Sequence, residues 1–430
     1  MSAPFLILVA VFVVLTLARV PIAFAMLVAA LAYLFAAGRD IGLAADQIMN
    51  TLANNYLLVA IPLFMLAANL MNAGSISDRL FAACEVVVGR VRGGLAQVDV
   101  LVSVLFASMS GSAVADAAGP GLVTIRAMDK AGYPRGFAAA IVAASSVLGP
   151  IIPPSIPMIL YALMANASVA ALFLGGVLPG LLIAGAMMVV VWITAHRRNF
   201  PIEPPIPRAE RPRVLARAIL PMGMPVVLLG GIYSGAFTPT EAAAVAALYA
   251  LLLAGGVYRE FGWSQVFGAF ADTARQTAVI LLMICGAFAV NYAVTAEQLD
   301  KALAAWIAGL GLSPLAFLVT VNLVFLVLGC LIDATTMLLV LVPVLLPSVA
   351  ALGIDPVYFG VVIVVNITIG LVTPPYGLLL FVLAALTRIP LREIIGECWG
   401  LIGSLVAALA LMVAFPGIVM WLPRVLGYVR

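Results

Sequence analysis

Charged residues are scarce in this sequence of 430 residues. Asp, Glu, Lys and Arg make up 9% of the chain, 65% of the residues are hydrophobic, and the mean hydropathy is +1.23. Soluble domains carry about 25% charged residues, so this composition excludes an ordinary soluble protein and indicates a polytopic membrane protein. The net charge of +3 is too small to indicate binding to nucleic acid.

Histidine, cysteine and catalytic motifs are also scarce. His196 is the only histidine, and we expect it at the level of the lipid headgroups. The four cysteines are far apart and lack the spacing of a metal site, so we interpret them as packed thiols. A Walker lysine motif, an HExxH motif and a plausible Ser–His pair are all missing, which excludes ATP hydrolysis and proteolysis by these routes.

Long hydrophobic runs dominate what is present. A bilayer core about 30 Å thick needs roughly 17 to 25 apolar residues per helix. On this basis we predict ten crossings, near residues 3–18, 21–37, 53–73, 137–165, 169–195, 218–234, 241–257, 276–294, 357–387 and 399–421. No cleavage pattern follows the first run, so we expect a retained helix.

Two further apolar segments, 95–128 and 314–350, are interrupted by polar residues at 110–121 and 329–336. Each is too long for one ordinary helix and is broken in its middle. Backbone that is not helical is tolerated at membrane depth only where protein or water covers it. We therefore predict two re-entrant helical hairpins that enter from opposite sides.

The segment 196–217 divides the chain. It carries six arginines and five prolines and is predicted to be a cytoplasmic linker, because basic residues favour the cytoplasmic side. Five crossings on each side of it place both termini outside. The predicted fold is thus an all-α polytopic membrane protein built from two inverted repeats, 1–195 and 218–430. Segments 75–92 and 295–312, which precede the hairpins, are predicted to be interfacial arm helices.

The chain contains its candidate site twice. GPIIPP at 149–154 matches GLVTPP at 370–375 in spacing, and each follows a hairpin. Glycine and proline break helices, which exposes carbonyl groups suited to Na⁺ and helix N-termini suited to a carboxylate. The alternative is that each proline pair only kinks a span.

Asp116 and Asp333 lie at the predicted hairpin tips, where a buried carboxylate costs at least about 2.5 kcal/mol unless a cation offsets that cost. Asp333 has the hydroxyl groups of Thr335 and Thr336 beside it, and we predict a Na⁺ site there. Asp116 is similarly placed near Ser110 and Ser112, but it could instead cap the following helix.

Three other polar features have simpler interpretations. Thr373 is a further candidate ligand, although its hydroxyl could bond back to its own helix. The segment TPTE at 238–241 predicts a helix start with a capping box. Asp99 and Asn291 stand in apolar surroundings without an assignable role.

With these residues in place, the chain resembles the large membrane subunit of tripartite ATP-independent periplasmic (TRAP) transporters over essentially its whole length. The most specific segments are GSAVADAAGPG at 111–121, LGPIIPPSIPMILYA at 148–162, GAFTPTEAAAVAALYAL at 235–251 and ITIGLVTPPYGLLLFV at 367–382.

The resemblance implies an elevator-type importer of organic acids, such as C4-dicarboxylates, sialic acid or sugar acids, driven by a Na⁺ gradient in the bacterial inner membrane. It implies two partners, a small four-helix membrane subunit and a periplasmic substrate-binding protein. It also implies two Na⁺ sites, at Ser110, Gly111, Ser112 and Asp116 with Gly149, Pro153 and Ser155, and at Asp333, Thr335 and Thr336 with Gly370, Thr373 and Pro374. Substrate would lie between them, near Ser112, Pro154, Thr336 and Pro375.

Three other function classes remain open at this point. A standalone Na⁺- or H⁺-coupled carboxylate transporter of related architecture would need no binding protein. An ion channel would conduct without substrate, and its pore hairpins would normally share one orientation. A membrane enzyme is disfavoured because the sequence offers no catalytic constellation.

Overall fold

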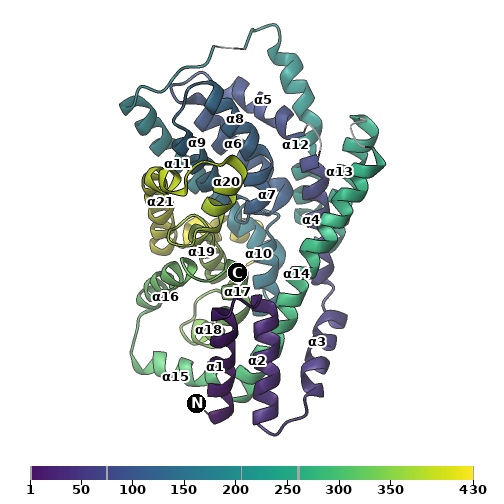
Figure 1. Ribbon diagram of the computed structural model, residues 1–430, viewed down its shortest axis with the longest axis vertical. Helices are drawn as coiled ribbons and strands as arrows, with labels where there is room; N and C mark the ends of the chain where they lie inside the picture. Colours follow the sequence, from purple (N-terminus) through teal and green to yellow (C-terminus); the bar gives the residue numbers. More distant parts are fainter. Residues whose placement is uncertain (1, 74–75, 205, 259–261, 430) are drawn as a thin grey trace.

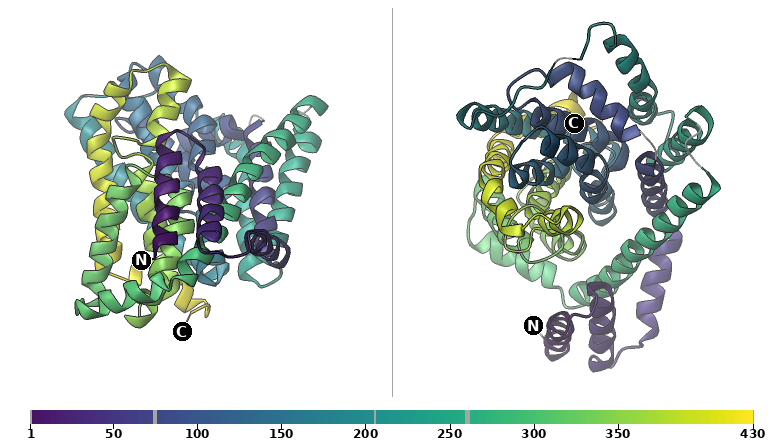
Figure 2. Two further views of the ribbon diagram at one scale, coloured as in Figure 1. Left: turned by 60° about the horizontal axis from the view of Figure 1, so that its bottom comes forward. Right: turned by 45° about the horizontal axis from the view of Figure 1, so that its top comes forward.

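The computed structural model describes residues 2–73, 76–204, 206–258 and 262–429, and within these ranges the chain forms helices and no strands. Figure 1 shows a cluster of helices on one side and a set of outer helices on the other. The cluster contains both hairpins and both broken helices. The outer set consists of α1–α4 and α12–α14, which curve around the cluster in the right-hand view of Figure 2.

The first half of the chain supplies twelve elements. They are α1 (Ala3–Leu17), α2 (Ile22–Ala36), α3 (Gly42–Asn54), α4 (Leu57–Ala73), α5 (Ile76–Val88), α6 (Gly94–Ser110), α7 (Ala113–Ala118), α8 (Pro120–Lys130), α9 (Arg135–Ser145), the 3₁₀ turn η1 (Ser146–Leu148), α10 (Ile156–Ala165) and α11 (Val169–Arg197).

The second half follows the linker. Its elements are α12 (Arg211–Tyr233), α13 (Pro239–Leu251), the π-helical η2 (Leu252–Val257), α14 (Trp263–Ala296), α15 (Leu299–Gly309), α16 (Pro314–Gly329), α17 (Ala334–Thr336), the π-helical η3 (Met337–Leu341), α18 (Val342–Ala351), α19 (Pro356–Gly370), α20 (Leu378–Thr387), α21 (Leu391–Ala414) and α22 (Gly417–Val425).

The two halves repeat the same order of elements. In each, an arm helix (α5 or α15) precedes a hairpin (α6–α8 or α16–α18), a broken helix (α9–α10 or α19–α20) and a long helix (α11 or α21). Helix α4 of the first half packs on α13 of the second half, and α14 of the second half packs on α2 of the first. The outer helices of the two halves therefore contact each other. The arms lie at opposite ends of the molecule in Figure 1, as expected for halves of opposite orientation. The boundaries predicted for the repeats stay a prediction.

The predicted count of ten full crossings is not met. The described residues contain six helices that are long and apolar enough to span a membrane, or seven if the bent pair α3–α4 is one span. Helices α1 and α2 have 15 residues each, and at 1.5 Å per residue each reaches only about 22 Å. The predicted crossings at 137–165 and 357–387 are each divided by a break, so neither is a continuous helix.

Two outer helices also differ from the prediction. Helix α14 runs for 34 residues, far beyond the predicted 276–294. Helix α3 is not predicted at all, because its sequence mixes polar and apolar residues, and the chain bends by 67° between α3 and α4. Hydropathy detects apolar length, so it misses both an amphipathic helix and the polar turns at the start of a long one.

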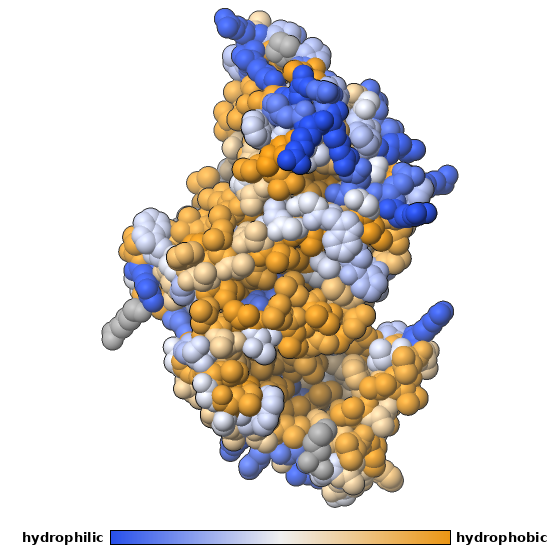
Figure 3. Space-filling view, turned by 90° about the vertical axis from the view of Figure 1, so that its left-hand side faces the viewer, coloured by the Kyte–Doolittle hydropathy of each residue, from blue (hydrophilic) through white to orange (hydrophobic). Residues whose placement is uncertain are grey.

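Apolar surface forms a broad band across the middle of the molecule. Figure 3 shows this band in orange, with the hydrophilic surface gathered mainly at one end. A band of this kind is what a bilayer covers, because lipid cannot satisfy exposed polar groups.

In the left-hand view of Figure 2 both termini lie toward the lower end of the helices.

The predicted capping box at the start of α13 is confirmed. The Thr238 hydroxyl accepts a hydrogen bond from the Glu241 N–H at 3.3 Å, and the Thr238 N–H donates to the Glu241 carboxylate at 2.8 Å. Pro239 occupies the first helical position, where its missing N–H costs nothing.

We expect Thr238→Ala to lower the free energy of unfolding by about 1 kcal/mol, because one N–H of the first turn loses its acceptor. Thr238→Ser is the matched control, since serine caps helices equally well. The midpoint of thermal unfolding of the purified protein in detergent measures the effect. Equal midpoints for the alanine and serine variants would show that the cap does not contribute.

Candidate functional site

The tip of the first hairpin packs directly against the first broken helix. Gly111 ends α6 with a φ of 63°, and a Cβ at this position would lie 2.5 Å from the carbonyl oxygen of Pro154. A Cβ on Gly149 would lie 3.0 Å from the backbone of Ser112. Both glycines are therefore required by close backbone contact, and the structure brings the tip of the first hairpin against the first break.

Three residues at this tip and on the elements packed against it carry buried oxygen atoms without a hydrogen-bond partner among the described residues. Asp116 is 1% exposed, and its Oδ2 accepts a hydrogen bond from the Ser103 hydroxyl at 2.8 Å. Its Oδ1 and the hydroxyls of Ser110 and Ser146, which are fully buried, have no hydrogen-bond partner among the described residues. Ser146 belongs to η1, which packs on α6 and α7. Buried polar atoms without partners are rare and costly, so this group of oxygens is suited to a bound cation.

Two predicted ligands act as helix caps through their side chains. The Ser112 hydroxyl accepts from the Ala115 N–H at 3.4 Å and begins α7. The Ser155 hydroxyl accepts from the Met158 N–H at 3.2 Å and donates to the carbonyl of Pro150. Both residues also begin the helical hydrogen-bond ladder, because the carbonyls of Ser112 and Ser155 accept from the N–H groups of Asp116 and Ile159 at 3.1 Å. The whole of 149–155, including Pro153, is buried.

The second hairpin repeats this packing. A Cβ on Gly370 would lie 2.8 Å from the carbonyl oxygen of Gly329, and the Tyr376 N–H donates to the Cys330 carbonyl at 3.3 Å. The tip of hairpin α16–α18 is thus held against the break between α19 and α20. Each predicted pairing of a hairpin tip with a broken helix is present in the structure.

Asp333 caps the short helix α17. Its Oδ2 accepts from the N–H groups of Thr335 at 3.0 Å and Thr336 at 3.1 Å, and lies 3.5 Å from the Thr336 hydroxyl. Its Oδ1 takes part in none of these three contacts. The carboxylate is half-buried, so it can serve as a cap and still present one oxygen to a cation.

The second break is more open than the first. Pro374 is half-buried, whereas Pro375 and Tyr376 are exposed. The Thr373 hydroxyl donates to the Ile369 carbonyl at 2.7 Å, which is the back-bonding alternative considered from the sequence. Thr373 could therefore contribute its oxygen only as an acceptor while this bond lasts.

Contacts between the halves bring the two tips toward each other. Helix α7 of the first hairpin packs on α20, and α10 packs on η3 and α18 of the second hairpin. Of the residues predicted near the substrate, Thr336 and Pro154 are buried, Ser112 is half-buried and Pro375 is exposed.

Sequence reasoning gave no role to several polar residues that support the tips. Asp99 is buried in α6, and its Oδ2 accepts from the Ser145 hydroxyl at 2.7 Å. The Asn366 side chain donates to Asn322 Oδ1 at 2.7 Å and joins α19 to α16. Asn291 of α14 donates to the Leu339 carbonyl of η3 at 3.2 Å, where the π-helical turn frees backbone groups. Their signal in the sequence was isolated polarity inside an apolar run.

The family model for the DctM component of the tripartite ATP-independent periplasmic transporters matches residues 9–418. This chain belongs to the DctM family. The predicted resemblance is thereby confirmed, and the chain is a multi-pass inner-membrane permease component of the TRAP class. The family is one of transporters, not of enzymes.

Members of the DctM family with similar sequences include two from well-known bacteria. A Vibrio cholerae protein named sialic acid TRAP transporter large permease protein SiaM is 39% identical over 96% of this chain and 97% of its own length. A Pseudomonas aeruginosa protein named C4-dicarboxylate TRAP transporter large permease protein DctM is 40% identical over 87% of this chain and 88% of its own.

Among solved structures, the Alcanivorax borkumensis YdaH transporter is similar in fold. It aligns with a TM-score of 0.58 at 19% identity and covers 86% of each chain. At that identity the likeness extends to the fold alone. It supports the overall helical fold described for this DctM family member.

Proposed function

We propose that this chain is the large permease subunit of a Na⁺-coupled importer of an organic anion, which works by an elevator movement of the helix cluster against the outer helices. A small four-helix membrane subunit and a periplasmic substrate-binding protein would be its partners. The observation that carries the proposal is the packing of each hairpin tip on a broken helix next to a carboxylate with an uncommitted oxygen.

Na⁺ fits the chemistry of both tips. It is a hard cation bound by carbonyl, hydroxyl and carboxylate oxygens. At the first tip, Asp116 Oδ1 and the hydroxyls of Ser110 and Ser146 are buried and have no hydrogen-bond partner within the part of the chain that the structure describes. At the second, Asp333 would bind the ion with Thr336 and the backbone of Gly370. The described residues hold no group of three or more His, Cys, Asp or Glu side chains that could bind a transition metal, and a Na⁺ site needs none.

An organic anion is the substrate class that the comparisons favour. The two relatives described above are named for sialic acid and for C4-dicarboxylates, both of which carry carboxylates. Helices α10 and α20 begin at the two breaks, and a helix N-terminus attracts a carboxylate. The substrate would bind between the tips, near Thr336 and Pro375, with Ser112 and Pro154 on the other side.

A polar cavity of about 570 Å³ lies beside the first hairpin. With the orientation predicted from the basic residues, it would open toward the cytoplasm. It is lined by α4, the arm α5 and hairpin helices α7–α8, and reaches Gly119 near the tip. Arg126 and Lys130 stand one turn apart on its wall and outnumber the one acidic residue there, Asp78. Ser77 also lines the cavity, and its hydroxyl is buried without a partner among the described residues. A cavity lined by basic side chains raises the local concentration of anions.

We expect the double substitution Arg126→Gln and Lys130→Gln to weaken the apparent affinity for substrate at the cytoplasmic face. The effect should be several-fold at low ionic strength and should shrink toward none in high salt, because exposed charges are screened within about 8 Å at 0.15 M. Substrate exchange in proteoliposomes measures it. Arg135→Gln is the control, since Arg135 lies outside the cavity and pairs with Asp129 at 3.3 Å. A deficit that persists unchanged in high salt would contradict an electrostatic role.

The proposed function is tested by thermal unfolding of the purified protein in NaCl, KCl and choline chloride. A ligand that binds only the folded state at a hundredfold excess over its Kd stabilises it by about 2.7 kcal/mol. We expect a saturable stabilisation specific to Na⁺. Identical midpoints in the three salts would contradict the Na⁺ sites. If the chain purifies from its native membrane without a small membrane subunit, a standalone carboxylate transporter would be favoured instead.

A further inference from the structure

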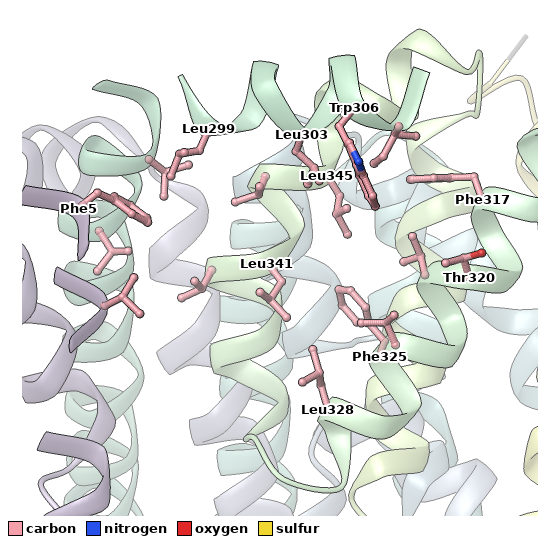
Figure 4. A pocket seen from close by; sticks show the side chains of 18 of the residues that line it. Phe5, Leu299, Leu303, Trp306, Phe317, Thr320, Phe325, Leu328, Leu341 and Leu345 are labelled. Atoms are coloured by element: carbon pink, nitrogen blue, oxygen red, sulfur yellow. The ribbon is translucent and has the colours of Figure 1, made fainter. Parts of the chain in front are cut away.

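An apolar cavity of about 480 Å³ lies between the outer helices and the second hairpin. It is bounded by α1, α2 and α14 on one side and by α16, η3 and α18 on the other, and α15 covers one end. Figure 4 shows Trp306 of α15 pointing into it above Phe325 and Leu341. The cavity occupies the position in the second half that the polar cavity occupies in the first, between the arm, the hairpin and the outer helices.

The lining of this cavity offers nothing to a polar ligand. Its side chains are hydrocarbon except for the Met26 thioether, the Trp306 indole and the Thr320 hydroxyl, and that hydroxyl donates to the Ala316 carbonyl at 2.8 Å. Pockets that select small polar molecules carry a few well-placed polar groups, and this one has no charged residue on its walls. Apolar cavities of this kind stay dry and bind apolar molecules.

The mouth of the cavity opens on the lipid-facing surface. Its lining residues Val9, Trp306 and Val324 are 38%, 63% and 49% exposed. Exposed apolar residues continue beyond the mouth along α1 and α16, at Leu6 and Leu323. The surface outside the cavity is therefore the kind that acyl chains cover, and no polar rim separates it from the interior.

Helix α15 places the cavity just below the membrane surface. Leu299, Leu303, Trp306, Ile307 and Leu310 all line it, at the spacing of one helical face. Lys301 of the same helix does not line it and is exposed, and Asp300 does not line it and is half-buried. An amphipathic helix of this kind lies at headgroup level with its apolar face toward the acyl chains.

We propose that this cavity binds one acyl chain of a membrane phospholipid, which enters beside Trp306 and wedges between the outer helices and the second hairpin. The headgroup would remain at the level of α15. The site is independent of the proposed ion and substrate sites, because its walls share no residue with them.

Fluorescence quenching by brominated lipid tests the proposal. In a background whose five tryptophans are replaced by phenylalanine, Phe325→Trp places an indole on the inner wall at a position that is only 2% exposed. Phe173→Trp is the matched control, because Phe173 is fully buried in α11 away from the cavity. The probe is a proteoliposome of phosphatidylcholine brominated in the middle of one acyl chain, compared with the unbrominated lipid.

We expect several-fold stronger quenching for Phe325→Trp than for Phe173→Trp. Adding Val344→Phe, which fills the cavity from α18, should remove the difference, whereas Val319→Phe on the outer face of α16 should not. Equal quenching of the two indoles would overturn the proposal. Equally strong quenching of the Phe325→Trp indole by a brominated detergent, with no phospholipid present, would also overturn it.

A second measurement uses the unaltered chain in case the tryptophan variants fail to fold. Native mass spectrometry after mild delipidation should detect one more retained phospholipid on the unaltered chain than on Val344→Phe. Equal numbers of retained phospholipids would overturn the proposal. Loss of that lipid on addition of a small membrane subunit would also overturn it, because the subunit would then be the occupant.

Discussion

Asp333→Asn is expected to remove the part of the Na⁺-specific stabilisation that the second site contributes and to abolish Na⁺-driven uptake, while leaving the second hairpin folded. Asparagine caps helices as well as aspartate does, so its side-chain oxygen keeps the hydrogen bonds from the N–H groups of Thr335 and Thr336. What the variant loses is the negative charge. The substitution therefore separates an ion-binding role from a capping role, which Asp333→Ala would confuse.

The expected loss is the stabilisation from one site, about 2.7 kcal/mol at a hundredfold excess of Na⁺ over its Kd. The midpoint of thermal unfolding with and without NaCl measures this increment, and uptake into proteoliposomes with an inward Na⁺ gradient measures the coupling. In KCl the variant and the parent should unfold alike.

Asp355→Asn is the matched control. Asp355 caps α19 in the same way, with Oδ1 accepting from the N–H groups of Val357 at 2.7 Å and Tyr358 at 3.2 Å, but it lies away from both tips. This variant should keep its full Na⁺ response. If Asp333→Asn keeps it too, the carboxylate is only a cap and the second ion site is wrong.

Gly111→Ala should destabilise the protein and eliminate transport. The residue has a φ of 63°, which costs an L-residue roughly 1–2 kcal/mol, and its new methyl group would lie 2.5 Å from the Pro154 carbonyl oxygen. Because backbone occupies that space, the tip has to move away from the break, and overpacking of this kind costs typically about 1–3 kcal/mol more. The unsatisfied oxygens behind the tip would lose their arrangement.

Gly132→Ala separates the clash from the backbone strain. Gly132 has a φ of 85°, and nothing lies within 4 Å of the Cβ that alanine would add. The control should show the smaller loss of stability and keep transport activity. Thermal unfolding and substrate uptake measure both variants, and equal behaviour would mean that the tip does not need its contact with the break.

The sequence was most informative where polar and helix-breaking residues interrupt apolar runs. The repeated Gly and Pro–Pro pattern located both breaks, and the polar residues at 110–121 and 329–336 located both hairpin tips. The capping box at Thr238 was predictable because it is local chemistry. These features have few alternative structures at membrane depth, where an unpaired backbone group is so costly.

Other features depend on contacts that no local pattern encodes. The bond from Ser145 to Asp99 joins residues 46 positions apart, and that between Asn366 and Asn322 spans 44. The extent of α14 and the presence of α3 were missed because hydropathy registers neither amphipathic nor polar helical turns. Two of the predicted crossings were not continuous helices because a broken helix reads as one apolar run, and two others, α1 and α2, are shorter than a full span.

The two breaks differ in their access to water, and this difference bears on the order of events in a transport cycle. Residues 149–155 are sealed, whereas Pro375 and Tyr376 reach the surface. An ion held as proposed at the second break could exchange with the surroundings directly, while one at the first could leave only after the hairpin tip lifts. The two ions would then have unequal residence times. The first break would load earliest and empty last, and release of its ion would limit the rate of turnover.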